Sequence, residues 1–475
     1  MYCEKVRADR PRECCGVFGI YGDAAAAEKT YLGLFSLQHR GQESAGIAVS
    51  AGKEMTVHRG MGLVWSVFSD PRIMPRLRGT AAIGHTRYST TGSSDLLNAQ
   101  PIMVRYKGNQ IAAAHNGNLV NSLELRTMLE GRGSIFQTTA DSEIVLHLIA
   151  RSEKDTVEDV VMDALSYLDG AYCFVFLTPE KLIAARDPHG FRPLCLGQAG
   201  SAFVVASESC AFDIIGARYI RSIEPGEVVV IDREGVTSRM MTTEGKRSYC
   251  VFEYIYFSRP DSLIFGEKVD KARRRLGKKL AEEAACEADI VIAIPDSANT
   301  AALGYAHRSG IPFEIGLIRS HYVGRTFIAP HQKARELDVR VKFNPVPGVV
   351  RDRRVVVVED SIVRGTTLKQ LVRIIRNAGA SEVHVRVSSP PIISPCYYGI
   401  DISSRGELIA SSHCVEDTRR YIEADSLAYL SVEGMLEAVP DGHFQCTACF
   451  TGAYPTAVPV HFEKDQFSVN CKADR

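Results

Sequence analysis

The pattern of hydrophobic and polar residues differs between the two halves of the chain. From residue 16 to residue 239, short strand-like runs alternate with turn residues, which is typical of a β-rich segment. Two stretches, 25–38 and 142–167, interrupt this pattern with apolar residues at helical spacing. The order predicts layered sheets and helices. The strand-like runs lie at 16–22, 81–90, 110–120, 171–177, 181–187, 202–209 and 227–231.

A second pattern begins after the polar stretch 241–248. Helical and strand patterns now alternate, and the apolar runs are continuous, as in VVVV at 355–358. Such runs, each separated by a helix, are typical of parallel strands buried on both faces. We therefore predict a doubly wound α/β domain, with its boundary near residues 240–265. Its predicted helices are 270–287, 300–309 and 366–378, and its predicted strands are 288–295, 353–360 and 382–391.

Length and composition narrow the class of protein. A chain of 475 residues exceeds one usual domain, and 45% hydrophobic with 24% charged residues is an ordinary globular composition. Lys plus Arg (56) equals Asp plus Glu (56), so no overall positive field favours nucleic acid. The first fifteen residues lack an apolar segment, and no apolar run of about 18 residues occurs, so we expect a cytoplasmic protein with no membrane span.

The thirteen cysteines are an odd number scattered over the whole sequence, which argues against a disulfide framework. Cys15 heads the first strand-like run, after a polar segment, 1–14, that cleavage could remove. Its α-amine, with a pKa of ~7.7–8.0, could then be the general base for its own thiol. On residue type alone, Cys15 could also be a small buried hydrophobic side chain, the commoner state of a lone cysteine.

Five segments of the first half together resemble class II glutamine amidotransferases. They are ECCGVFGI (13–20), SLQHRGQESAGIA (36–48), GHTRYSTTG (84–92), AHNGNLVN (114–121) and TTADSE (138–143). The resemblance implies an N-terminal nucleophile (Ntn) αββα glutaminase domain over residues 15–245, with residues 1–14 as a propeptide. Cys14, the last residue of that propeptide, leaves the cleavage chemistry open.

The same resemblance implies a role for each residue of the glutaminase site. Cys15 is the nucleophile, and the Asn116 side-chain amide and the Gly117 N–H form the oxyanion hole. Arg87 binds the α-carboxylate of glutamine as a bidentate fork, and Asp141 binds the α-ammonium group. Taken singly, Asn-Gly is a common turn and a lone Arg or Asp is usually solvated.

In the second half, VVVVEDSIVRGTTLKQLV (355–372) runs from a buried strand through two acids and a loop into a helix. Backbone N–H groups, hydroxyls and a helix N-terminus are suited to bind a phosphate, and the acids suit a ribose diol or Mg²⁺. The segment resembles the signature of type I phosphoribosyltransferases. This resemblance implies that Glu359 and Asp360 bind the ribose hydroxyls and the metal ion. The implied 5-phosphate-binding residues are Ser361, Arg364, Gly365, Thr366 and Thr367.

Three further features of the second half bear on this site. Segment 294–306 resembles the pyrophosphate loop, where Ser297 contributes to the metal site, and 322–328 resembles a flexible loop that closes over the substrate. This chain has Arg319, Ser320 and His321 where the family usually has Lys-Asn-Arg, which leaves loop closure and turnover open. Glu359 is a milder departure from the family sequence, because the amidotransferase branch of the phosphoribosyltransferases usually has two Asp residues at positions 359 and 360.

The fusion of the two motif sets, with RDPHGFRPL (186–194) and EYIYFSRPDS (253–262), resembles amidophosphoribosyltransferases. The resemblance implies the first committed step of de novo purine synthesis. Glutamine hydrolysis supplies ammonia, which a channel carries to 5-phosphoribosyl 1-diphosphate (PRPP), giving 5-phosphoribosylamine, glutamate and diphosphate. It also implies Mg²⁺, feedback by purine nucleotides, a homotetramer, and a phosphoribosyltransferase domain with a cysteine-bearing tail over residues 246–475.

Cys446 and Cys449 form a C-x-x-C pair, a spacing that suits metal or cluster ligation but does not complete a four-ligand site. One subset of the family carries a [4Fe–4S] cluster, and its pattern implies Cys250, Cys396, Cys446 and Cys449 as ligands, in a structural role. Free buried thiols or a zinc site are the alternatives.

Two other functions stay open at this stage. A phosphoribosyltransferase fold can serve in a regulator that binds nucleic acid, although the balanced charge and the complete glutaminase motif set disfavour this. The chain could also be a transferase that uses only free ammonia, if residues 1–14 are never removed. Comparison of glutamine with ammonium as nitrogen donor separates these possibilities.

Overall fold

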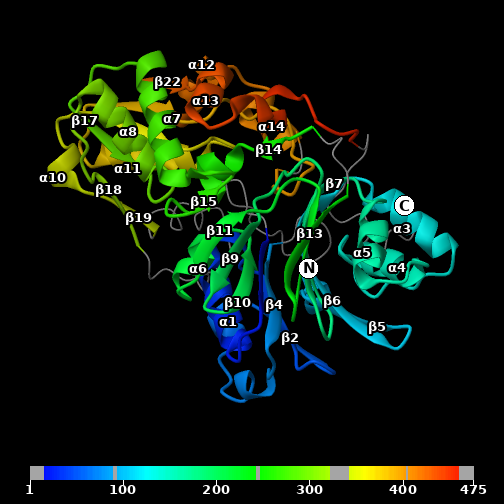
Figure 1. Cartoon of the computed structure of the whole chain (residues 1–475). Helices are drawn as coiled ribbons and strands as arrows, with labels where there is room; N and C mark the ends of the chain where they lie inside the picture. Colours follow the sequence, from blue (N-terminus) through cyan, green and yellow to red (C-terminus); the bar gives the residue numbers. More distant parts are fainter. Residues whose placement is uncertain (1–14, 89–93, 242–245, 321–341, 403–404, 459–475) are drawn as a thin grey trace, which may run out of the picture.

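The computed structural model describes residues 15–88, 94–241, 246–320, 342–402 and 405–458 (Figure 1). The amino-terminal half contains two antiparallel sheets of seven and six strands. In spatial order the first consists of β11 (Arg218–Ser222), β9 (Cys195–Ala199), β10 (Ala202–Ala206), β1 (Gly16–Tyr21), β4 (Ala81–Arg87), β2 (Ser44–Ser50) and β3 (Met55–Met61). The second consists of β13 (Gly235–Met240), β12 (Glu227–Asp232), β8 (Leu182–Arg186), β7 (Gly170–Leu177), β6 (Asn109–Leu119) and β5 (Ile102–Tyr106).

The two sheets pack face to face, and helices cover their outer faces. Val17 of β1 and Ala112 of β6 belong to one buried cluster between the sheets, whereas Phe18, the neighbour of Val17, packs outward with Leu34 of a helix. This alternation follows from the period of two along a strand. The result is the expected αββα sandwich. Its helices are α1 (Ala26–Ser36), α2 (Val64–Val67), α3 (Ser122–Gly131), α4 (Glu143–Arg151), α5 (Val157–Leu165) and α6 (Cys210–Asp213).

The helical spacing predicted over 142–167 is confirmed, and the structure divides this stretch into two helices, α4 and α5. Ser152 after α4 is extended, and the Thr156 side chain accepts a hydrogen bond from the Asp159 N–H and so caps α5. An N-cap of this kind starts a new helix. Strand β2 was not predicted, because its sequence SAGIAVS is rich in small residues and lies buried along its whole length.

The carboxy-terminal half is built on a parallel sheet buried on both faces, as predicted. Val356 and Val358 of one strand contact one helical layer, and Val355 and Val357 contact the other. The sheet order is β17 (Ile290–Ala293), β20 (Arg354–Glu359), β21 (Glu382–Val387) and β22 (Ser426–Tyr429). The helices of this half are α7 (Val269–Glu283), α8 (Asn299–Ser309), α10 (Pro347–Val350), α11 (Thr366–Asn377), α12 (Val415–Ile422), α13 (Val432–Ala438) and α14 (Ala448–Thr451).

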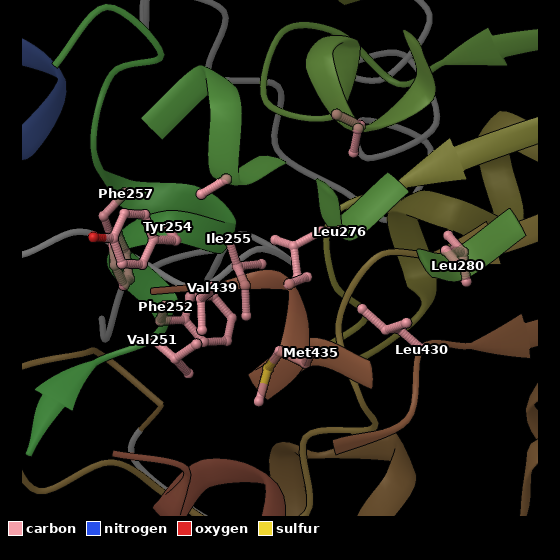
Figure 2. Close-up of a cluster of buried hydrophobic side chains, with 14 of the residues drawn as sticks. Val251, Phe252, Tyr254, Ile255, Phe257, Leu276, Leu280, Leu430, Met435 and Val439 are labelled. Atoms are coloured by element: carbon pink, nitrogen blue, oxygen red, sulfur yellow. The ribbon is translucent and has the colours of Figure 1, made fainter. Parts of the chain in front are cut away.

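The larger core of this half includes a short π-helix, Glu253–Phe257, that follows the domain boundary. Figure 2 shows Phe252 and Ile255 beside Met435 of α13, with Leu276 of α7 close by. Helix α7 ends at Glu283, four residues before the predicted end. Short strand pairs are β14 (Tyr249–Cys250) with β23 (Gln445–Cys446), β15 (Leu263–Ile264) with β16 (Glu267–Lys268), and β18 (Leu317–Arg319) with β19 (Phe343–Pro345).

Among the described residues, no helix has the length and apolar content needed to cross a membrane. The predicted boundary at 245/246 adjoins residues 242–245, which lie outside the described ranges. The predicted propeptide 1–14, with Cys14, and the predicted flexible loop 322–328, with His321, also lie outside them.

Candidate functional site: a thiol pocket, a phosphate loop and a cysteine cluster

Cys15 lies directly before β1, at the wall of a small pocket. The residue is only 6% exposed, and its thiol donates a hydrogen bond to the Tyr88 carbonyl at 3.3 Å. Burial raises the pKa of this thiol to about 11, despite the hydrogen bond to Tyr88 and the nearby Arg87 charge. At neutral pH the thiol is therefore protonated, and it needs a base before it can attack. The pocket is lined by Cys15, Arg87, Tyr88, Gln100, His115, Gly117, Ala140 and Asp141.

Asp141 is a buried carboxylate held at the pocket wall. Its Oδ2 accepts a hydrogen bond from the Leu119 N–H at 3.0 Å, and its Oδ1 lies 3.6 Å from His115 Nδ1. Burial acts to raise the pKa of Asp141, but the charge and hydrogen bond of His115 outweigh burial and lower it. The group is thus a fixed negative charge that can meet a substrate cation.

The structure brings three of the predicted glutaminase residues, Arg87, Gly117 and Asp141, into the pocket with Cys15. Asn116 does not line the pocket: it is fully buried, and its Nδ2 donates to Ser207 Oγ at 3.4 Å.

Four pocket residues were missed by sequence analysis: Tyr88, Gln100, His115 and Ala140. Gln100 Oε1 accepts a hydrogen bond from the His115 N–H at 2.8 Å, and its Nε2 donates to Ser142 Oγ at 2.9 Å. Gln100 therefore ties two of the motif segments together. Tyr88 and His115 lie inside the quoted motif segments, directly next to Arg87 and Asn116. This adjacency to predicted site residues was the one feature of the sequence that could have identified them.

The predicted phosphate loop lies between β20 and α11. Gly365 precedes α11 with φ of +74°, a backbone conformation that favours glycine. Asp360, 1% exposed, accepts hydrogen bonds from Ser297 Oγ at 2.5 Å and from Ser361 Oγ at 2.6 Å. The structure thus joins the predicted metal residue Ser297 to the acid pair across 63 positions of sequence.

Two basic residues near this loop form ion pairs. Arg364 lies 2.9 Å from Glu407, and Arg319 Nη1 donates to Asp296 Oδ2 at 2.9 Å. Arg319 was one of the departures from the family sequence, and its contact is with the segment predicted to bind pyrophosphate. It thus keeps a cation beside that segment.

The four cysteines predicted as ligands come together where the two halves meet. Cys250 and Cys446 are paired residues of the parallel β14–β23 ladder, and the Cys449 carbonyl accepts hydrogen bonds from Ile393 and Ser394. Burial raises the pKa of Cys449 well above its ordinary range, and the charges of the other three cysteines raise it further. Four thiolates so close together repel one another, so they fit a bound group that supplies positive charge.

Within the described ranges, no three His, Cys, Asp or Glu side chains converge to hold a single metal ion. Tetrahedral zinc needs four ligands at ~2.0–2.3 Å from one point. A cubane cluster takes one cysteine at each of its irons, so its ligands need not converge in this way. Thiolates are ligands for zinc and for an iron–sulfur cluster alike, so both remain alternatives for this group of cysteines.

A buried ion network connects the thiol pocket with the cysteine cluster. Arg40 Nε donates to the Cys15 carbonyl at 3.3 Å, and Arg40 Nη2 donates to Glu253 Oε1 at 2.7 Å. Arg192 Nη1 donates to the same Oε1 at 3.1 Å. Glu208 completes the charge balance, accepting from Arg40 Nη1 at 2.6 Å. Sequence analysis did not find this network.

Comparison with known proteins agrees with the two-part site. A model of the glutamine amidotransferase domain matches residues 85–213, and one of the phosphoribosyl transferase domain matches residues 266–389. Amidophosphoribosyltransferase of Bacillus subtilis (strain 168) is 53% identical over 452 residues, covering 94% of this chain and 95% of the relative. Amidophosphoribosyltransferase 2, chloroplastic, of Arabidopsis thaliana is 52% identical over 450 residues, which cover 94% of this chain and 80% of the relative.

The chain belongs to the amidophosphoribosyltransferase family. It is a glutamine-dependent enzyme that transfers nitrogen to PRPP, the reaction that its family contributes to purine biosynthesis. The glutamine PRPP amidotransferase of B. subtilis, solved in complex with ADP and GMP, superposes with a TM-score of 0.91 at 51% identity, covering 95% of this chain and all of that chain. Both the family and the fold of a glutaminase fused to a phosphoribosyltransferase, expected from the motifs, are confirmed.

Proposed function

We propose that Cys15, once residues 1–14 are removed, is the nucleophile that hydrolyses glutamine. The observation that carries this proposal is the pocket in which the thiol meets the Arg87 guanidinium and the Asp141 carboxylate. Arg87 binds the α-carboxylate of glutamine and Asp141 binds its α-ammonium group, so the side-chain amide faces the thiol. The freed α-amine of Cys15, with an ordinary pKa of ~7.7–8.0, accepts the thiol proton.

The glutaminase half-reaction then proceeds through a thioester. The thiolate adds to the amide carbon, and the Gly117 N–H with the Asn116 amide stabilises the oxyanion. Protonated nitrogen leaves as ammonia, and water hydrolyses the γ-glutamyl thioester to glutamate. Asn116 lies beside Gly117 on β6 but does not line the pocket, so its part in the oxyanion hole requires its amide to leave Ser207, which it contacts at 3.4 Å.

The second half binds PRPP at the β20–α11 loop. Ser361, Gly365 and the first residues of α11, Thr366 and Thr367, offer hydroxyl and N–H groups to the 5-phosphate, with Arg364 as the cation. Glu359 and Asp360 bind the ribose hydroxyls, and with Ser297 they would hold Mg²⁺, which would supply positive charge to the pyrophosphate leaving group. Ammonia adds to ribose C1, and the C1–O bond to pyrophosphate breaks.

Further partners follow from the relatives and from the cysteine site. Cys250, Cys396, Cys446 and Cys449 would hold a [4Fe–4S] cluster of structural role. Because a B. subtilis relative was solved with ADP and GMP, we expect purine nucleotides to bind this chain and inhibit it. We also expect a homotetramer.

Asp360→Asn should lower pyrophosphate release by on the order of 10²-fold with either glutamine or ammonium as nitrogen donor, because both donors use the same PRPP site. The assay contains Mg²⁺ and PRPP, and it measures glutamate in parallel. Asp270→Asn, which alters an exposed ion pair on α7, is the control and should behave as wild type. If Asp360→Asn lowered only the glutamine-dependent activity, the assignment of Asp360 to the PRPP site would be contradicted. If the wild-type enzyme released pyrophosphate with ammonium but not with glutamine, the assignment of Cys15 as nucleophile would be contradicted.

Protein purified without oxygen should contain about four irons and four sulfides per chain. Exposure to air should bleach its visible absorbance, and activity with both donors and the thermal midpoint should fall in parallel, because the four cysteines join β14, β23 and the segment near residue 396. Iron analysis, absorbance and a thermal scan on one sample provide the measurement. One zinc per chain, or full activity after bleaching, would refute the cluster or its structural role.

A further inference from the structure

The segment 396–401 belongs to the cysteine cluster at one end and contacts the thiol pocket along its length. It begins with Cys396, one of the proposed ligands. Asn118 Nδ2, next to Gly117 on β6, donates to the Tyr397 carbonyl at 2.9 Å. At the far end, the Tyr88 hydroxyl donates to Asp401 Oδ2 at 3.5 Å. The same six residues are thus part of both sites.

The closest approach is between two glycines. A Cβ added to Gly399 would lie 3.1 Å from the Gly117 carbonyl carbon and 3.2 Å from its oxygen. Gly399 also has φ of +101°, where an L side chain is strained. Backbone therefore packs directly on backbone, and a shift of Gly399 has no flexible side chain to absorb it.

The middle of the segment is clamped by a buried arginine. Arg192 donates from Nε and Nη2 to the Tyr398 carbonyl at 3.1 and 2.8 Å, and its Nη1 lies 3.7 Å from Cys250 Sγ. The Tyr398 N–H donates to Cys396 Sγ at 3.3 Å. Arg192 thus contacts the Cys250 sulfur directly, and it contacts the segment that begins at Cys396 through the backbone carbonyl of Tyr398.

We infer that residues 396–401 are a positioning segment that sets the place of Gly117 in the glutamine pocket and makes that place depend on ligation at Cys396. With the cluster bound, Cys396 and Arg192 hold the segment in place, and the backbone of Gly399 packs against Gly117 and keeps it in position. Without the cluster, Cys396 loses its anchor and Gly117 loses its support. The part played by ligation rests on the proposed cluster, whereas the contact of Gly399 with Gly117 does not.

The first test is Gly399→Ala. We expect kcat with glutamine to fall by about tenfold, because the added Cβ displaces the backbone of Gly117 by a few tenths of an ångström, and misplacement of a catalytic group slows the chemical step. The KM for glutamine should change less than about threefold, since Arg87 and Asp141 still hold the substrate. Ammonium-dependent activity and iron content should match wild type.

Gly266→Ala is the matched control, because Gly266 also has positive φ, +84°, but an added Cβ would meet nothing within 4 Å. This variant carries the same kind of backbone strain without the contact, so it should keep both activities. Glutamine-dependent kcat of Gly399→Ala within twofold of wild type would overturn the inference. Equal losses with glutamine and ammonium would also overturn it, because they would indicate general unfolding.

The second test measures the pocket without turnover. The rate at which a chloroketone analogue of glutamine alkylates Cys15 is compared before and after anaerobic removal of iron from the whole protein. We expect about tenfold slower alkylation after iron removal in wild type, and less than a twofold further change in Gly399→Ala. An unchanged rate in wild type would overturn the dependence on ligation. Protein that carries no iron as purified would refute the cluster itself, and Gly399→Ala would still decide whether the segment positions Gly117.

Discussion

Cys15→Ala should abolish glutamine-dependent activity, by on the order of 10⁴-fold or more, and retain activity with ammonium. Cys15 carries the one thiol among the described residues that line the pocket, and no Ser or Thr hydroxyl lies among them to replace it. Removal of a nucleophile stops the covalent route outright, and what remains comes from binding and the oxyanion hole. Ammonium enters the reaction at the PRPP site, which Cys15 does not touch.

The experiment compares glutamate and pyrophosphate release with each donor. Both wild type and variant should be produced with the initiator Met directly before residue 15, so that removal of residues 1–14 does not affect the comparison. Cys286→Ala is the control, because this half-buried thiol lies in the other half of the chain. Glutamine-dependent turnover that survives in Cys15→Ala would assign the nucleophile elsewhere, and loss of the ammonium reaction as well would show that the substitution disrupts the fold.

Glu253→Gln should lower the free energy of unfolding by about 3–5 kcal/mol, which is typical when one partner of a buried ion pair is removed. The Glu253 carboxylate is 0% exposed and accepts hydrogen bonds from Arg40, Arg192 and Ser258. The substitution keeps the shape of the side chain but leaves two buried guanidinium groups with one carboxylate, Glu208, between them. The measurement is the urea midpoint at pH 7. Asp70→Asn, which breaks an exposed pair with Arg72, should leave the midpoint unchanged.

The same network predicts how stability depends on pH. Burial acts to raise the pKa of Glu253, but the charge and hydrogen bonds of Arg40 outweigh it and hold the pKa below its ordinary range, and Glu208 is shifted in the same direction. A carboxyl group with a lowered pKa in the folded state contributes stability above its unfolded pKa, ~4.3, and loses it as the pH falls through the folded value. The urea midpoint of wild type should therefore be flat from pH 7 to about 5 and fall below that. Glu253→Gln should show a shallower acid decline, and an equal decline in both proteins would contradict the role of Glu253.

The sequence by itself determined the chemistry and the architecture of each half. The doubly wound sheet could be predicted, because the run of valines in β20 is a local signal of a strand buried on both faces. The αββα layers of the first half were implied by the resemblance of its motifs to class II glutamine amidotransferases. The grouping of Cys15 with Arg87 and Asp141 was also predicted, since the spacing of the motif set is specific. The helical character of 142–167 was also predicted, but the break between α4 and α5 was not, because it depends on the capping side chain of Thr156 and leaves no mark in the apolar periodicity.

Only the tertiary structure decided what lies between the halves. No local pattern marks Gly399 as the neighbour of Gly117, or Glu253 as the partner of Arg40, because these residues are more than 200 positions apart and meet through the packing of one domain on the other. His115 and Gln100 became pocket residues through packing within the first half, where Gln100, in the bend before β5, bonds the His115 N–H of β6. Periodicity specifies which residues are buried, and the relative placement of the packed elements then specifies which buried residues touch.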